Sequence, residues 1–173
     1  MKTCVFPGSF DPISNGHLNI IERASKIFDT VYVLVSFNAN KSYFFNTEER
    51  IELIKKCTGH LNNVIVTSFN GMVVEFAKKV GAGVIIRGLR NPNDYQNELE
   101  LFYFNSSLDN SIETMLMFAD KNNLFTSSSM IKELISYGGN TALYLPKQIE
   151  EAVYKRVKEI KGEAFNEHTR INW

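Results

Sequence analysis

The sequence predicts a single α/β domain built on an open five-stranded parallel sheet with helices on both faces. Short β-branched apolar runs alternate along the chain with segments whose apolar residues recur at helical spacing, as in successive βα units. The length of 173 residues suits one domain with a sizeable core. No internal repeat, low-complexity segment or linker divides the chain. We expect residues 1–160 to form the domain and residues 161–173 to form a polar C-terminal tail.

Five segments have the length and composition of strands. In chain order they are Lys2–Phe6, Val31–Ser36, Val64–Ser68, Gly83–Arg87 and Thr114–Phe118. Their continuous apolar character is typical of parallel strands that helices cover on both faces. Because a helix separates each strand from the next, the connections are crossovers and the strands should run parallel.

Helical periodicity and local capping signals predict the helices. The expected helices are His17–Phe28, Thr47–Cys57, Met72–Val80, Pro92–Asn105, a helix from Ser127 to Gly138, and a last helix from Pro146 to Ile160. Asn46 and Glu49 have the spacing of a capping box for the second of them. Gly81 suits the C-terminus of the third, and Ser127–Ser129 suit the N-terminus of the fifth.

Composition and charge disfavour several classes of protein. Hydrophobic residues make up 44% and charged residues 22%, and the formal net charge is zero, so no overall basic field favours nucleic acid or an anionic membrane. No apolar run reaches the roughly 18 residues of a membrane span, and the chain begins directly with a strand rather than a signal segment. Cys4 and Cys57 lie in apolar segments and indicate buried free thiols in a reducing cytoplasm.

Polar side chains gather where the predicted strands end. They are Ser9 and His17 after the first strand, Lys41 after the second, Arg87, Arg90 and Asp94 after the fourth, and Ser127–Ser129 after the fifth. The carboxyl ends of parallel strands share one edge of the sheet, where open α/β folds bind ligands. Cations, a histidine and serine hydroxyls at helix starts indicate a polyphosphate site. The chain has neither GxxxxGK[ST] nor GxGxxG, which disfavours a P-loop hydrolase and a dinucleotide redox enzyme.

Several of these residues fall within longer motifs. Gly8-Ser9-Phe10-Asp11-Pro12 with Gly16-His17 resembles the N-terminal signature of the nucleotidyltransferase superfamily, which has an HxGH motif and a later ISSS/T motif. Here these read Ser14-Asn15-Gly16-His17, with Ser in place of the first His, and Thr126-Ser127-Ser128-Ser129. Together with Lys41, Thr47-Glu48-Glu49-Arg50 and Ile86-Arg87-Gly88-Leu89-Arg90, the chain resembles the bacterial phosphopantetheine adenylyltransferases from about Thr3 to Ile160.

The resemblance implies a Rossmann-like dinucleotide-binding nucleotidyltransferase fold and a specific reaction. The adenylyl group of ATP would pass to 4′-phosphopantetheine by direct in-line attack, giving dephospho-coenzyme A and pyrophosphate. Mg²⁺ would bridge the ATP phosphates, so the protein need not supply a cluster of metal ligands. The resemblance also implies a homohexamer and inhibition by coenzyme A, with neither nucleic acid nor a membrane as partner.

The resemblance also assigns roles to residues. His17, Lys41 and Arg90 would be catalytic, and Ser9, Lys41, Val73 and Arg87 would bind the acceptor. The expected ATP-binding residues are Ser9, Phe10, His17, Gly88, Leu89, Arg90, Glu98, Asn123, Leu124, Phe125, Thr126, Ser127, Ser128 and Ser129. Asn97 and Asn123 stand where the family commonly has an aromatic residue, and Thr126 stands where it has an aliphatic one. These departures concern stacking on adenine more than binding of phosphate.

Each role has a structural alternative. The two arginines could simply form ion pairs with Asp94 or Glu98, the serine triplet could only cap a helix, and Val73 could belong to the core. At the level of function, one alternative is a related nucleotidyltransferase whose acceptor is nicotinate mononucleotide or glycerol phosphate. The other is a non-catalytic module that binds adenine nucleotides on a similar sheet.

Overall fold

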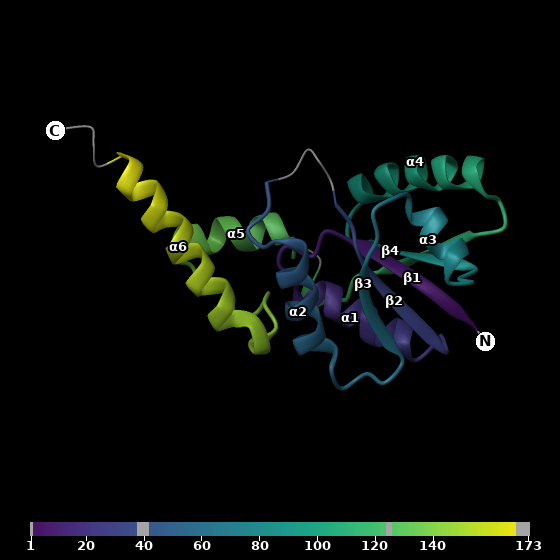
Figure 1. Ribbon diagram of the computed structural model, residues 1–173, viewed down its shortest axis with the longest axis horizontal. Helices are drawn as coiled ribbons and strands as arrows, with labels where there is room; N and C mark the ends of the chain where they lie inside the picture. Colours follow the sequence, from purple (N-terminus) through teal and green to yellow (C-terminus); the bar gives the residue numbers. More distant parts are fainter. Residues whose placement is uncertain (1, 38–41, 124–125, 169–173) are drawn as a thin grey trace.

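The predicted five-stranded parallel sheet forms the centre of the protein, and its strand order is β3-β2-β1-β4-β5. The structure is a computed structural model, and it describes residues 2–37, 42–123 and 126–168 (Figure 1). The strands are β1 (Thr3–Gly8), β2 (Thr30–Val35), β3 (Val64–Ser68), β4 (Val84–Leu89) and β5 (Glu113–Phe118).

Six α-helices and two short 3₁₀ turns connect and cover the strands. The helices are α1 (Asn15–Ser25), α2 (Thr47–Thr58), α3 (Val73–Lys79), α4 (Pro92–Leu108), α5 (Ser128–Ser136) and α6 (Glu150–His168), and the 3₁₀ turns are η1 (Lys121–Asn123) and η2 (Lys147–Ile149). The capping box predicted at α2 is present: Asn46 Oδ1 accepts from Glu49 N at 2.8 Å, and Asn46 N donates to Glu49 Oε2 at 2.9 Å. Gly81 follows α3 with a φ of 66°, as a helix C-terminus of this kind requires.

Several boundaries differ from the sequence prediction by a few residues, and three of them bear on the site or on the C-terminal tail. β1 continues through Gly8, which pairs with Val35, and β4 continues through Leu89, which pairs with Phe118. Gly88 and Leu89 lie beyond the predicted end of the fourth strand at Arg87, but the neighbouring strand holds them in the sheet. The last helix continues to His168, beyond the point near Lys161 where the tail was expected to begin.

Alternate residues of the strands supply two separate cores. Cys4 and Phe6 of β1 point to the face that α1, α2, α5 and α6 cover, and they belong to the larger cluster of buried apolar side chains. Val5, between them, points to the opposite face and packs with residues of α3. This period of two is the geometry of a β-strand buried on both faces. In Figure 1, α1 and α2 accordingly lie on one side of the sheet and α3 on the other.

The strand order creates a topological switch point beside β1. From β1 the chain moves outward to β2 and β3, then returns to place β4 on the other side of β1. β1 pairs with β2 over its whole length, but with β4 only at Cys4↔Val84 and Val5↔Ile85. Beyond these two pairs the strands separate, at the topological switch point where α/β folds bind ligands.

No helix in the described ranges combines the length and apolar character that a bilayer span would need.

Candidate active site

The chain turns sharply where β1 ends. Phe10 has a φ of 48°, a left-handed conformation that is uncommon for a residue other than glycine. Its ring is buried and packs edge-on against Phe6 at 5.5 Å and against His17 at 5.1 Å between centroids. A Cβ on Gly8 would lie 2.8 Å from this ring, so the close return of the ring requires glycine there. The turn leaves Ser9 half-buried where β1 ends.

His17 is fixed by the start of α1. Ser14 is the N-cap of this helix, and its backbone N–H donates to His17 Nδ1 at 3.1 Å. Because Nδ1 accepts this hydrogen bond, the proton of the neutral ring belongs on Nε2, which is then a donor. Ser14 stands at the first position of the HxGH motif, and its hydroxyl also lies 3.0 Å from Nδ1. Although serine replaces the first histidine of the motif, it still provides a hydrogen-bond partner for His17.

The ring of His17 is neutral at physiological pH. Burial, and secondly the nearby charge of Arg90, lower the pKa of His17 from 6.5 to about 4. The Nε2–H therefore remains a neutral donor at the N-terminus of a helix, a position whose dipole favours anions.

Arg90 connects the end of β4 to two other segments. Its Nε and Nη2 donate to Asp94 at 2.9 and 3.1 Å, and its Nη1 donates to the carbonyl oxygen of Thr126 at 3.1 Å. The predicted ion pair with Asp94 is thus confirmed. The side chain lies between α4 and the segment that leads into α5, and from there its charge acts on His17.

Arg87 and Glu98 bind each other. The guanidinium donates twice to the carboxylate, at 2.5 and 3.0 Å, and both side chains are largely buried. The sequence predicted a phosphate or carboxylate partner for Arg87, and the structure provides the carboxylate. The resemblance assigned Arg87 to the acceptor and Glu98 to ATP. This ion pair therefore links the expected acceptor site to the expected ATP site.

At the end of β4, the carbonyl oxygen of Leu89 accepts from Ala119 N at 2.8 Å on the β5 side, so the backbone groups of Gly88 point toward β1. β5 pairs with both Gly88 and Leu89 on one side, whereas the pairing of β4 with β1 has already ended at Ile85. A Cβ on Gly88 would lie 2.7 Å from Ile20 Cδ1, so glycine lets α1 pack closely against this edge. The backbone edge that faces β1 is therefore left for hydrogen bonds to a ligand.

The serine triplet divides into three roles. Ser127 caps α5 by accepting from Met130 N at 3.1 Å, and Ser128 Oγ donates to the carbonyl oxygen of Pro12 at 2.8 Å. Ser129 is exposed in the first turn of α5. Of the three hydroxyls, only that of Ser129 is presented to solvent without a hydrogen bond inside the described part of the protein. The capping alternative thus explains Ser127, and a loop contact explains Ser128.

The remaining predicted site residues are Val73, Thr126, Asn123, Lys41, Leu124 and Phe125. Val73, the first residue of α3, is partly buried and packs against the smaller core, as its structural alternative predicted. Thr126 is 2% exposed, and its Oγ1 has no partner among the described residues. Asn123 ends η1, and only its backbone is described. Lys41, Leu124 and Phe125 lie outside the described residues.

Sequence reasoning did not identify the contacts of Asp11. This carboxylate is 2% exposed and accepts from Phe44 N and Phe45 N, each at 2.9 Å, and from Lys132 Nζ at 3.0 Å. It joins the loop after β1 to the segment before α2 and to α5. An acidic residue inside an apolar loop was the available signal, because a buried carboxylate requires partners.

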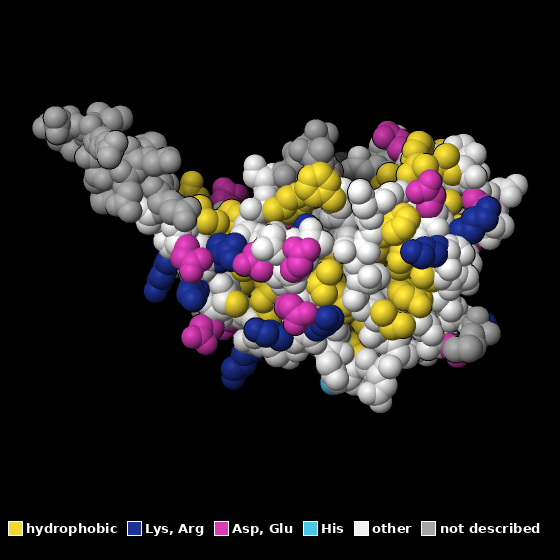
Figure 2. All heavy atoms as spheres, in the orientation of Figure 1, with side chains coloured by type: hydrophobic (Ala, Val, Ile, Leu, Met, Phe, Trp, Pro, Cys, Tyr) yellow, Lys and Arg dark blue, Asp and Glu magenta, His cyan; other side chains and the backbone are white. Residues whose placement is uncertain are grey.

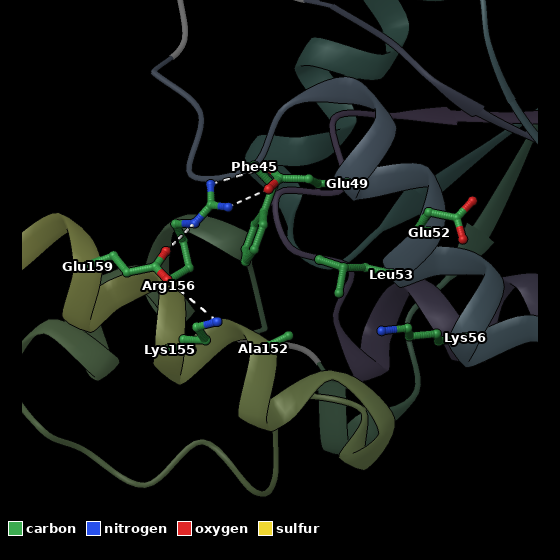
Figure 3. Close-up of a pocket in the computed structure, with 9 residues that line it drawn as sticks. All are labelled: Phe45, Glu49, Glu52, Leu53, Lys56, Ala152, Lys155, Arg156 and Glu159. Atoms are coloured by element: carbon green, nitrogen blue, oxygen red, sulfur yellow. Dashed lines mark hydrogen bonds and ion pairs between the residues drawn. The ribbon is translucent and has the colours of Figure 1, made fainter.

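A groove between α2 and α6 lies apart from these residues (Figure 3). In it, Arg156 of α6 points toward α2, where it pairs with Glu49 and donates to the carbonyl oxygen of Phe44 at 2.6 Å. The hydrogen bond from Arg156 lowers the pKa of Glu49. None of the predicted site residues lines this groove, and the contacts of Arg156 attach the C-terminal helix to the start of α2.

No three His, Cys, Asp or Glu side chains within the described ranges come together as metal ligands. The carboxylates of Asp94 and Glu98 are each held by an arginine. The two arginines and the neutral histidine suit an anionic ligand.

Comparison with known proteins places this geometry in a family context. The cytidylyltransferase-like family matches residues 5–134. A phosphopantetheine adenylyltransferase of Clostridium perfringens is 44% identical over 163 residues, covering 94% of this chain and 99% of the relative. Those of Clostridium botulinum and Staphylococcus saprophyticus are 45% and 44% identical, covering 91% and 90% of this chain and 99% and 96% of the relatives.

A solved structure from Vibrio parahaemolyticus, provisionally named a nicotinate-nucleotide adenylyltransferase, superposes with a TM-score of 0.67. The match covers 91% of this chain and 95% of that one, at 20% sequence identity. At this identity the likeness supports the fold alone.

The pKa of His17 sets a pH dependence of stability. The folded state binds a proton at His17 less readily than the unfolded state, so the free energy of unfolding should fall as pH drops from about 6.5 toward 4. Urea unfolding of the protein and of His17→Asn, at pH 7 and pH 5, measures this. The variant should lose less stability between the two pH values than the parent. An equal loss in both proteins would contradict the assignment.

The roles of two serines can be separated by stability. Ser128→Ala removes a hydrogen bond to Pro12 and should lower the free energy of unfolding by about 1 kcal/mol. Ser129→Ala, a matched change at the next position, should alter it by less than about 0.5 kcal/mol. Denaturant unfolding of both variants gives the comparison. If Ser129→Ala were the more destabilising, the assignment of the two hydroxyls would be wrong.

Proposed function

The chain belongs to the cytidylyltransferase-like family and, within it, to the phosphopantetheine adenylyltransferases, and on this premise we propose that it adenylylates 4′-phosphopantetheine with ATP. The products are dephospho-coenzyme A and pyrophosphate, which makes the reaction a step of coenzyme A biosynthesis. The observation that carries the proposal is the neutral His17 beside the switch point between β1 and β4. The charge of Arg90 acts on this ring, and the pairing of β1 with β4 ends at Ile85.

The reaction needs no nucleophilic side chain. An oxygen of the acceptor phosphate attacks the α-phosphorus of ATP, a new P–O bond forms, and the bond to the β-phosphate bridging oxygen breaks in line with it. The electron pair of the broken bond leaves with pyrophosphate. The protein contributes alignment of two anionic groups and stabilisation of the charge on the phosphoryl oxygens.

His17 is the proposed catalytic donor to the α-phosphate. Its Nε2–H is held by the contact of Nδ1 with Ser14, and the lowered pKa keeps the ring neutral. A donor fixed in advance stabilises the oxygens of the α-phosphate as their charge changes, without the cost of reorienting water.

Arg87 and Arg90 are proposed to serve the two ligands. Arg87 would bind the acceptor phosphate, which requires it to share or exchange Glu98, its present partner. Arg90 would contact the ATP phosphates while Asp94 holds its guanidinium in place. With each arginine already paired, the site carries less uncompensated charge before the ligands bind.

Backbone groups and hydroxyls complete the proposed substrate sites. Gly88 and Leu89 would offer backbone to ATP, and Ser129 would offer the exposed hydroxyl at the start of α5. The proposed contacts of Ser9 and Val73 with the acceptor rest on the resemblance to the family. The proposed roles of Lys41, and of the segment from Asn123 to Phe125 toward adenine, rest on the resemblance alone.

We further propose that ATP enters as its magnesium complex, so the ion is part of the substrate. The family typically uses Mg²⁺, and the ion prefers phosphate oxygens and water to a complete set of protein ligands. The paired carboxylates of Asp94 and Glu98 are consistent with an ion held by the nucleotide. We place the enzyme in the cytoplasm, with coenzyme A as an inhibitor. The two buried free thiols, Cys4 and Cys57, support that compartment.

A homohexamer is the proposed assembly, with α4 in the interface. None of the described side chains of this 17-residue helix is buried in the single chain. Its exposed apolar residues include Tyr95, Leu101, Tyr103, Phe104 and Leu108. Apolar side chains also gather around α4 in Figure 2. A helix of this kind gains stability mainly by packing, which a second copy of the chain would provide.

Pyrophosphate release measured across a panel of acceptors tests the function. With MgATP, 4′-phosphopantetheine should give turnover, whereas nicotinate mononucleotide and glycerol phosphate should not. His17→Ala should retain ATP binding and lose roughly 10²–10³ in kcat, the usual cost of removing one such donor. Turnover with nicotinate mononucleotide alone would refute the acceptor. ATP binding with no pyrophosphate from any acceptor would favour the non-catalytic module.

The assembly is tested by substitution on α4. Phe104→Glu places a charge among the exposed apolar side chains and should convert hexamers to smaller species, as measured by light scattering after size-exclusion chromatography. Tyr137→Glu is the control, because Tyr137 is 82% exposed at the end of α5 and should leave the hexamer intact. A monomeric parent protein would refute the assembly, as would a Phe104→Glu hexamer.

A further inference from the structure

Arg50 is a charged side chain buried without an acidic partner. It lies in α2 and is 1% exposed. Within the described residues no carboxylate pairs with it. Its guanidinium instead donates to the carbonyl oxygens of Ser9 at 2.7 Å, Ser36 at 3.3 Å and Asn46 at 3.3 Å, and to Thr47 Oγ1 at 3.1 Å. The ring of Tyr43 lies 4.2 Å from its Cζ.

These partners come from three different segments. Ser9 follows β1, Ser36 follows β2, and Asn46 and Thr47 begin α2. One planar group therefore connects the ends of two neighbouring strands with the start of a helix. Burying a charge without a counter-ion is costly, and four oxygen dipoles offset that cost only in part. Stability alone does not account for a cation here, because an apolar side chain could fill the same space.

The shortest of these hydrogen bonds acts on one peptide plane. The carbonyl of Ser9 and the N–H of Phe10 belong to the same planar trans peptide unit, so they point in opposite directions. When Arg50 holds the oxygen, it also sets the direction of the Phe10 N–H. That N–H makes no hydrogen bond within the described chain, and Phe10 is the residue with a φ of 48°. The ring of Phe10 packs against His17.

We propose that Arg50 is a positioning residue that orients the Ser9–Phe10 peptide, so that the Phe10 N–H donates to a substrate phosphate beside His17. The inference rests on the proposed function for the identity of that phosphate. Arg50 does not touch the substrate itself. Its unpaired positive charge additionally makes the loop after β1 more attractive to anions.

Two measurements on matched variants test the proposal. Arg50→Lys keeps the charge but cannot reproduce the fork of donors, and Lys55→Met removes a charge from the exposed face of the same helix. The first measurement is the change in the Phe10 amide resonance when MgATP is added to ¹⁵N-labelled protein. The second is kcat/KM for pyrophosphate release with 4′-phosphopantetheine.

The parent protein and Lys55→Met should show a large Phe10 amide shift and similar kcat/KM. Arg50→Lys should lose most of the shift and at least about tenfold in kcat/KM, approaching the cost of one lost donor. Retention of the Phe10 shift in Arg50→Lys, or a kcat/KM within twofold of the parent, overturns the proposal.

Thr47→Val covers the case in which Arg50→Lys does not fold. It removes one hydroxyl partner of the guanidinium and leaves Arg50 itself in place. It should reduce both readouts in part, by about two- to fivefold in kcat/KM, and unchanged readouts count against the proposal. A parent protein that shifts the Phe10 resonance yet releases no pyrophosphate refutes the proposed function and leaves the role of Arg50 supported.

Discussion

The separation of β1 and β4 is the constraint on which the rest of the structure depends. β2 pairs with β1 along its whole length, whereas β4 pairs with it at only two positions. The ends of β1 and β4 therefore each leave unpaired the backbone edge that faces the other strand. Such an edge is unfavourable in a closed core, but it suits a ligand with many oxygen atoms. The segments that follow β1 and β4 carry His17 and Arg90, and the charge of Arg90 acts on His17.

Buried charges hold the loop after β1 in a demanding shape. Asp11 accepts three hydrogen bonds from the segment before α2 and from α5, and Arg50 holds the carbonyl of Ser9. Between these anchors, Phe10 adopts its left-handed conformation. A conformation of that kind persists only where the surroundings determine it strongly. Burying the charges of Asp11 and Arg50 costs free energy, and the hydrogen bonds of these two groups fix the loop that lies against His17.

The two arginines of the candidate site are paired with carboxylates within the protein. Arg87 binds Glu98, and Arg90 binds Asp94. Both carboxylates come from α4, the helix whose own apolar residues remain exposed in the single chain. The helix that supplies these partners is thus the same one that we place in the subunit interface. Assembly and the orientation of the two arginines would then share one structural element.

Much of the fold and part of the site could be read from the sequence, because those features depend on residues close together in the chain. Apolar periodicity determined the order of strands and helices, and local spacing determined the caps at Asn46 and Ser127. The shared edge of parallel strands predicts that Ser9, His17 and the arginines lie close together, and the charge of Arg90 does act on His17. Contacts between distant segments decided the rest. The extension of β4 to Leu89 depends on its register with β5, and the hydroxyl of Ser128 is engaged by Pro12, more than a hundred residues earlier. The role of Arg50 has the same origin, since no sequence pattern shows which carbonyl a buried guanidinium will hold.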